Sequence, residues 1–199
     1  MNELSNHDHS RFLTRTNHRV GRISYAGAEA ASEGINPAVM REGVAIQMTW
    51  PGAPTVYYGD EAGLCGFTDP DNRRTYPWGR EDYQMIDFHR VMIRIHKQYE
   101  VLKTGSLAFL WNDYQGLAYA RFSRKEQMIV IVNNMDHARE VEVQLWQAGI
   151  SRLEDAKMER VVCTSAEGFT EAPEVYTAAA GILRMQMPAF GCVVLYHKN

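Results

Sequence analysis

The stretch that decides the fold is Tyr57–Leu64, with the sequence YYGDEAGL, continued by Asp69–Arg74, DPDNRR, as far as Trp78. The apolar segment before it, Pro54–Tyr58, leads into a glycine turn, and acids, paired arginines and an aromatic ring follow at once. A strand that delivers polar groups into the loop at its carboxyl end is how α/β barrels build active sites. We therefore expect a strand at 55–58, apolar on both faces because helices cover it.

Two helices flank this strand. The first opens at Asn36-Pro37, where Asn is a favoured N-cap and Pro a favoured first helical residue, and it ends near Trp50. The second is expected over about 82–99. Each buries one face, because apolar residues recur at three- and four-residue spacing. These residues are Met40, Val44 and Met48 in the first helix, and Met85, Phe88, Met92, Ile95 and Tyr99 in the second.

The first half of the chain therefore alternates between strand and helix. Residues 1–8 are expected to be the end of an earlier strand that runs into Asn6-His7-Asp8, and residues 9–35 to be a loop with a helical turn. The order strand, helix, strand, helix is that of a βα barrel or of a parallel sheet.

The pattern changes near Lys103-Thr104-Gly105, beyond which short β runs are separated by turn residues. Glu140–Leu145 alternates between polar and apolar side chains, as in a strand with one buried face. Residues 105–199 are therefore expected to form an antiparallel β-sandwich. The expected strands are 107–111, 117–122, 128–132, 141–146, 160–164, 182–187 and 192–197.

The composition argues against nucleic acids and membranes as partners. The net charge is -3, and acids and bases are spread without a basic stripe, so no nucleic acid is expected. No apolar run approaches the ~20 residues of a membrane helix, so no membrane is expected, and residues 1–8 lack the basic start and apolar middle of a signal peptide. Cys65, Cys163 and Cys192 have no CxxC spacing, which predicts reduced thiols in a cytoplasmic protein.

Two motifs, in order and separated by one helix, resemble a family of enzymes. Asn6-His7-Asp8 followed by Arg11-Phe12-Leu13 is similar to the segment that ends the seventh barrel strand in the α-amylase family of glycoside hydrolases, and Gly52–Glu61 is similar to the eighth strand. The loop 69–78 most resembles the cyclomaltodextrinase, neopullulanase and maltogenic amylase group.

The resemblance implies an α/β plus all-β chain. Residues 1–104 would be the C-terminal quarter of a TIM barrel, the last two βα units of its (β/α)8 fold, holding strands seven and eight with their helices. Residues 105–199 would be the family's C-terminal β-sandwich domain.

The resemblance also implies retaining hydrolysis of α-1,4 glucosidic bonds in maltooligosaccharides, cyclodextrins or pullulan, without a cofactor. This chemistry needs a nucleophilic carboxylate and a carboxylic acid about 5–5.5 Å apart. Related enzymes place both after the fourth and fifth strands, whereas this chain begins at the seventh. We therefore expect the isolated chain to be inactive. We also expect it to associate with itself or with a missing N-terminal barrel segment, because two barrel strands leave unpaired edges.

Four residues carry the expected site. By resemblance, Asp8 is the carboxylate that stabilises the transition state. It would face the positive charge that develops on the sugar and accept hydrogen bonds from the sugar hydroxyls. His7 would hydrogen-bond the same sugar. Asp69 and Arg73 would bind a glucose unit further toward the non-reducing end of the α-glucan.

The residues themselves leave structural alternatives open. Asp8 is also suited to capping a turn, and His7 to a structural role. His7 and His9 form an HxH pair to which Asp8 adds a ligand. Catalytic zinc needs three protein ligands in fixed geometry, and the nearest other histidine, His18, lies in an unpatterned loop, so no metal is expected.

Other acids of the opening stretch have structural interpretations too. Adjacent strand residues point to opposite faces, so Asp60 and Glu61 would not flank one bond; one is expected to hydrogen-bond at the barrel rim and the other to support the loop. Asp71 and Arg74 also fit a surface ion-pair cluster with Arg73.

A non-enzymatic function is the competing interpretation. The chain would then be a non-catalytic carbohydrate-binding or barrel-stabilising module. Sugars stack on aromatic faces, but most aromatics at strand ends are core residues, which leaves Trp78 as a candidate. The later strands show no paired exposed aromatics, and this favours the stabilising role.

Overall fold

The computed structural model describes all residues from 1 to 199, which form two compact units. The first unit comprises residues 1–48 and 52–92, and the second comprises residues 49–51 and 93–199. The division is one of spatial compactness. The expected domain boundary between residues 104 and 105 stays a prediction.

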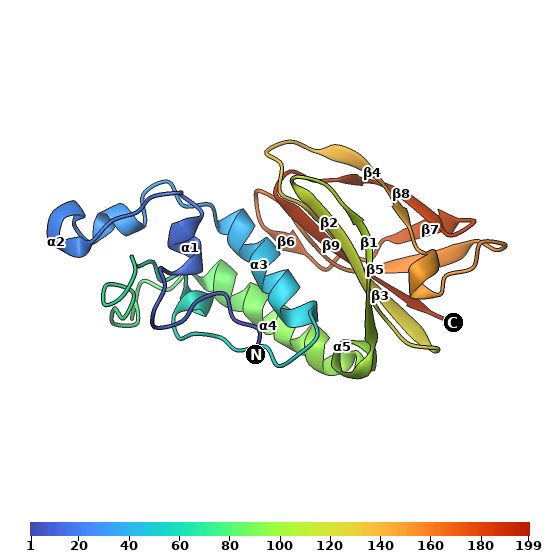
Figure 1. The fold of residues 1–199 in the computed structure, drawn as a ribbon, viewed down its shortest axis with the longest axis horizontal. Coiled ribbons are helices and arrows are strands. Elements are labelled where there is room, and N and C mark those ends of the chain that lie inside the picture. The colour runs from blue at the N-terminus through green and yellow to red at the C-terminus, as the bar shows by residue number, and fades with distance from the viewer. The chain divides into compact units, whose positions relative to one another are not determined.

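The first unit is built around two long helices, α3 (Pro37–Thr49) and α4 (Tyr83–Gln98), the second of which continues into the second unit (Figure 1). Both predicted helices are confirmed. The Asn36 side chain accepts the Ala38 N–H at 3.0 Å, and Asp82 caps α4 by accepting the Met85 N–H at 3.0 Å. The remaining helices of this unit are short: α1 (Phe12–Arg15), α2 (Ile23–Ala26), η1 (Glu29–Ala31) and η2 (Asp60–Ala62).

The apolar stripes predicted for these helices are buried except at Tyr99, which lies just beyond the end of α4 and is only partly buried. Met40, Val44 and Met48 of α3 have exposed fractions of 0 to 2%, and so do their counterparts in α4, Met85, Phe88, Met92 and Ile95. No helix in the chain is long and apolar enough to cross a membrane.

The prediction of a strand at 55–58 is wrong, because these residues form no strand in the structure. The chain there runs parallel to the N-terminal segment, but the two share only one bridge, between Asn2 and Pro54. Asn2 N–H donates to Ala53 O at 2.9 Å, and Thr55 N–H donates to Asn2 O at 2.8 Å. The buried faces expected for it are also absent, because Tyr58 is 42% exposed. A ladder needs partners along its length, and within residues 1–199 these two segments have only each other.

The second unit is an antiparallel sheet that curves into a nearly closed barrel. Its strands follow the order β1-β2-β3-β9-β5-β7-β8-β4, with β6 paired to β5, and the two end strands β1 and β4 contact each other. The helices α5 (Glu100–Thr104) and η3 (Trp146–Ala148) complete the unit. The strands are β1 (Ser106–Asn112), β2 (Gly116–Phe122), β3 (Glu126–Asn133), β4 (Arg139–Gln144), β5 (Ala156–Thr164), β6 (Phe169–Thr170), β7 (Val175–Ala179), β8 (Ile182–Met187) and β9 (Gly191–Lys198).

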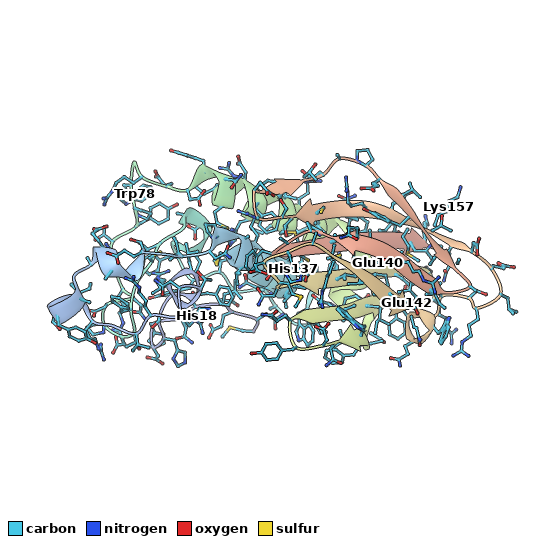
Figure 2. All side chains as sticks on the ribbon, turned by 90° about the horizontal axis from the view of Figure 1, so that it is seen from above. His18, Trp78, His137, Glu140, Glu142 and Lys157 are labelled. Atoms are coloured by element: carbon cyan, nitrogen blue, oxygen red, sulfur yellow. The ribbon has the colours of Figure 1, made fainter.

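All seven predicted strands are present, and β6 and β7 were not predicted. The alternation that predicted β4 is confirmed, because Val141 and Val143 are buried in the core while Glu140 and Glu142, labelled in Figure 2, are exposed. One continuous core collects inward side chains from β2, β3, β4, β5, β7, β8 and β9.

A buried arginine ties the sheet to the ends of the neighbouring helices. Arg121 of β2 is only 1% exposed. Its guanidinium donates to Leu102 O at 2.8 Å, Gly105 O at 2.7 Å and Thr49 O at 3.1 Å. These carbonyls lie at or just beyond the last turns of α5 and α3, where no intrahelical partner exists. The one side chain therefore satisfies three orphan acceptors.

We expect Arg121→Met to lower the free energy of unfolding by about 2–4 kcal/mol, because three buried carbonyls lose their charged donor. Urea denaturation of the chain would measure this. The matched control is Arg184→Met on β8, whose guanidinium pairs with Glu142 on the exposed face; its cost should stay under about 1 kcal/mol. Equal losses for the two variants would refute the structural role of Arg121.

Candidate functional site

The segment Asn6–His9, here called the 6–9 loop, presents two of the predicted site residues to solvent. The Asn6 side-chain oxygen accepts the Asp8 N–H at 2.9 Å and the His9 N–H at 3.2 Å, which closes a local turn. The side chains of His7 and Asp8 are 67% and 64% exposed, and His7 Nε2 lies 3.4 Å from Asp8 Oδ1. The turn that Asp8 was suited to cap is thus made by Asn6.

A second segment, Thr68–Arg73, here called the 68–73 loop, holds the 6–9 loop by its backbone. Asn72 Nδ2 donates to Asn6 O at 3.2 Å and to His9 O at 2.6 Å. Arg73 Nε donates to His7 O at 3.2 Å, and Thr68 Oγ1 donates to Asp8 O at 2.9 Å. Four consecutive carbonyls of one loop therefore accept hydrogen bonds from side chains of the other. The bonds fix the backbone and leave the His7 and Asp8 side chains free to contact a ligand.

The other two predicted site residues lie on the same 68–73 loop. Arg73 forms an ion pair with Asp69, and both side chains are close to half exposed. Arg22 donates to Asp69 O. The structure thus brings His7, Asp8, Asp69 and Arg73 together on two loops that are bonded to each other, although some 60 residues separate the loops in sequence.

A buried ion pair supports the two loops from below. Arg11 is fully buried, and its Nη1 lies 3.0 Å from Asp60 Oδ1 while its Nε donates to Asn72 O at 3.0 Å. The guanidinium also lies over the Tyr57 ring, 4.1 Å from its centroid. Burial raises the pKa of Asp60, and hydrogen bonds from Ser5 and Arg11 oppose that rise. The predicted structural role of Asp60 is confirmed by this pair.

No family model matches the chain, but individual proteins are similar to it in sequence and in fold. The amylopullulanase of Thermoanaerobacter thermohydrosulfuricus is 35% identical over 156 residues, which are 72% of this chain and 10% of that protein. Neopullulanase 2 of Thermoactinomyces vulgaris is 32% identical over 152 residues, 74% of this chain and 23% of that protein. The α-amylase of Geobacillus thermoleovorans, solved in complex with acarbose, shares the fold with a TM-score of 0.74 and 19% identity, over 99% of this chain and 38% of that one.

The chain belongs to the α-amylase family of glycoside hydrolases. It spans between a tenth and a quarter of the length of the two curated relatives named above. Cyclomaltodextrinases are also among the relatives, at 33% identity for the protein of Thermoanaerobacter pseudethanolicus over 67% of this chain and 21% of that one. The family resemblance drawn from the two motifs is therefore confirmed.

Three residues organise the two loops in ways that the sequence did not predict: Asn72, Thr68 and Arg11. Asn72 is fully buried, and Arg11 is too. A polar residue at each of these positions is ordinary for a loop, and only the pairing of distant segments shows what the side chain bonds. The one available signal was that Arg11 and Asn72 stand within the two quoted motifs, which gave no role to either side chain.

The ion-pair cluster considered for Asp71 and Arg74 is wrong. Asp71 Oδ2 accepts the Ile23 N–H at 2.8 Å, and Arg74 donates to Cys65 O at 3.3 Å. Both side chains therefore organise backbone around the site. Trp78, labelled in Figure 2, is 75% exposed. The centroid of its ring lies 4.5 Å from the centroid of the Tyr76 ring. The exposure of Trp78 leaves it accessible to a sugar ring.

No three His, Cys, Asp or Glu side chains lie together in a geometry that holds a metal ion. The HxH pair His7 and His9 therefore lacks the third protein ligand that catalytic zinc needs.

We expect Asn72→Asp to loosen the 6–9 loop, because a carboxylate of the same size replaces the two N–H donors and faces the carbonyls of Asn6 and His9. Amide hydrogen exchange at Asp8 and His9 should become about tenfold faster or more. The control is Asn134→Asp, at an exposed position of the second unit. Unchanged exchange at Asp8 and His9 would show that Asn72 does not hold the loop.

Proposed function

We propose that residues 1–199 form part of an α-glucan hydrolase that cleaves α-1,4 glucosidic bonds by a retaining mechanism. The observation that carries the proposal is the joint placement of His7, Asp8, Asp69 and Arg73 on two mutually bonded, solvent-facing loops. The names of the related amylopullulanase and neopullulanase support it, as does acarbose bound by a protein of the same fold. Maltooligosaccharides, cyclodextrins and pullulan are the proposed substrates.

Each residue has a role that its surroundings permit. Asp8 bears a negative charge toward the oxocarbenium-like centre and accepts hydrogen bonds from sugar hydroxyls, which strengthen in the transition state. Its backbone is anchored at Thr68, and its carboxylate lies 3.4 Å from His7 Nε2. His7 hydrogen-bonds the same sugar. Arg73 and Asp69, paired and half exposed, grip a neighbouring glucose unit.

The remaining carboxyl groups come, in this proposal, from outside residues 1–199. Retaining hydrolysis needs two carboxyl groups about 5–5.5 Å apart across the scissile bond. Of the acids beside Asp8, Asp60 is buried against Arg11 and Asp69 is paired with Arg73. A further barrel segment would supply them, and it would also pair with the extended backbone near Asn2 and Pro54. Self-association of the chain is the alternative way to cover these edges.

A non-catalytic module remains the second candidate, in which the chain binds carbohydrate or only stabilises a barrel. Binding of α-glucan without any hydrolysis by the enzyme that contains this chain would favour it. We also propose a cytoplasmic location, which the three unbridged cysteines support.

In the enzyme that contains this chain, Asp8→Asn should lower kcat by about 10²–10³-fold, because one preorganised charge at the transition state is lost. The melting temperature should not change, since the side chain is largely exposed. The matched control is Asp87→Asn, another exposed acid, which pairs with Arg90 on α4. A kcat equal to that of the control would remove Asp8 from the reaction.

The isolated chain of residues 1–199 should release no glucose or maltose from maltotriose, because one of three carboxylates cannot run a double displacement. Adding a polypeptide with the remaining barrel strands should restore release. Chromatography of the products measures both. Robust release by the purified chain without any partner would sink this part of the proposal.

A further inference from the structure

A third stretch of chain, here called the 21–28 segment, lies against the 68–73 loop. It comprises Gly21–Ala28 and includes the short helix α2. Three successive residues of the segment contact every second residue between positions 67 and 71. The pairs are Gly21 with Phe67, Arg22 with Asp69, and Ile23 with Asp71. The two stretches therefore run side by side in the same direction.

The first of these contacts is a close approach that only glycine permits. A Cβ atom at position 21 would lie 2.7 Å from the ring of Phe67, which is closer than side-chain atoms pack. Phe67 is itself only 2% exposed, and a close-packed interior gives it little room to move aside. The segment is thus placed against a core residue just before the 68–73 loop begins.

The second contact reaches a residue of the candidate site. The Arg22 guanidinium donates to the main-chain carbonyl of Asp69, whose carboxylate pairs with Arg73. Hydrogen bonds from a charged donor are roughly twice as strong as those between neutral groups. Two residues further along the loop, Asp71 Oδ2 accepts the Ile23 N–H at 2.8 Å. These bonds fix the main chain around Asp69 and leave its side chain 44% exposed.

Burial of apolar surface does not account for the position of the 21–28 segment. Gly21 is its only buried residue, and α2 buries none of its four residues. In Figure 1, α2 lies apart from the long helices α3 and α4. The contacts with residues 67–71 therefore hold the segment in place, and through the same contacts the segment holds the loop.

Asp69 differs from its neighbours in what holds its main chain. The bonds to the 6–9 loop come from other side chains of the 68–73 loop, namely those of Thr68, Asn72 and Arg73. The carbonyl of Asp69 is bonded to Arg22 instead. Loss of Arg22 would therefore leave the bonds beneath Asp8 in place and would release only the Asp69 end of its ion pair.

We propose that Arg22 is a positioning residue that holds Asp69 where the Asp69–Arg73 pair binds a glucose unit of the α-glucan. Arg22 does not touch the sugar in this arrangement, because it acts on the main chain of Asp69. The inference rests on the proposed function of Asp69 and Arg73. Its consequence is that Arg22 controls the affinity for the α-glucan and leaves the rate of bond cleavage, which depends on Asp8, unchanged.

The test is the steady-state hydrolysis of maltohexaose by the enzyme that contains this chain. Arg22→Met removes every donor of the guanidinium and should raise KM about tenfold while kcat stays within about twofold, as expected when uniform binding is lost. Arg22→Lys keeps a charged donor and should bring KM back to within about threefold of the parent value. The matched control is Arg19→Met, three residues earlier, whose guanidinium pairs with Glu33; its KM should equal that of the parent.

A double-mutant cycle shows whether Arg22 acts through Asp69. Asp69→Ala alone should raise KM, and adding Arg22→Met to it should raise KM no further, because two residues that act as one unit are not additive. A residue that only stabilised the fold would give additive losses. Fully additive losses would therefore overturn the inference.

The remaining outcomes separate this inference from the function on which it rests. If Asp69→Ala raises KM and Arg22→Met does not, the inference alone fails. If Asp69→Ala leaves KM unchanged, the proposed role of the Asp69–Arg73 pair fails and the inference fails with it. A fall in kcat for Arg22→Met would overturn a role confined to binding. If Arg22→Met does not fold, Arg22→Gln, which is shorter and uncharged, decides by the same comparisons.

Discussion

The buried pair of Arg11 and Asp60 is the interaction on which the architecture of the first unit depends. Arg11 lies just beyond the 6–9 loop, Asp60 follows the extended segment at Pro54–Tyr58, and the same guanidinium reaches Asn72 O. One side chain thus joins three distant stretches of chain. Replacing such a pair by apolar groups is often tolerated, whereas removal of one partner leaves a buried charge and costs several kcal/mol. The Arg11–Asp60 pair therefore contributes mainly by fixing where the loops lie, and less by raising the free energy of unfolding.

This arrangement separates the anchoring of the site from its chemistry. Backbone carbonyls of the 6–9 loop accept every bond from the 68–73 loop, while the side chains that would meet substrate stay exposed. A preorganised backbone lowers the reorganisation needed when charge develops at a bound sugar. A buried arginine also anchors backbone in the second unit, where Arg121 donates to carbonyls at helix ends and is itself buried.

Capping residues and the spacing of apolar residues correctly predicted the helices and strands that local interactions determine. The Asn36 cap and the apolar stripes placed α3 and α4, and the alternation of Glu140–Leu145 placed β4. The strand β7, Val175–Ala179, was missed although Val175, Tyr176 and Thr177 favour a strand, because the segment is short and only its pairing with β5 and β8 defines it. The apolar pattern failed at 55–58, where it suggested a strand but no second neighbour is available to form a ladder.

The candidate site shows the same limit. His7, Asp8, Asp69 and Arg73 were predicted by resemblance of two sequence motifs to a family, but the bonds that join their loops run between residues some 60 positions apart. Burial of polar groups such as Asn72, Gln127 and Glu42 follows from tertiary packing alone. Glu42 shows what such burial does to a carboxyl group. Burial raises the pKa of Glu42 to about 9, although the charge of Arg41 opposes the rise. A carboxyl group with this pKa is mostly protonated at neutral pH.

The acids around the candidate site differ in how far their carboxylates are already bonded. Asp60 is committed to a buried guanidinium, Asp71 to the backbone N–H of Ile23, and Asp69 to an ion pair with Arg73. Moving Asp60 or Asp71 toward a sugar would break an existing bond that the fold uses, whereas Asp69 is half exposed and can contact a sugar while it stays paired with Arg73. Asp8 differs, because its main chain carries the anchoring bonds and its carboxylate makes only a long contact with His7. A carboxylate held at its backbone and free at its oxygens can turn to a ligand without structural cost, and in this chain that combination occurs where the two loops meet.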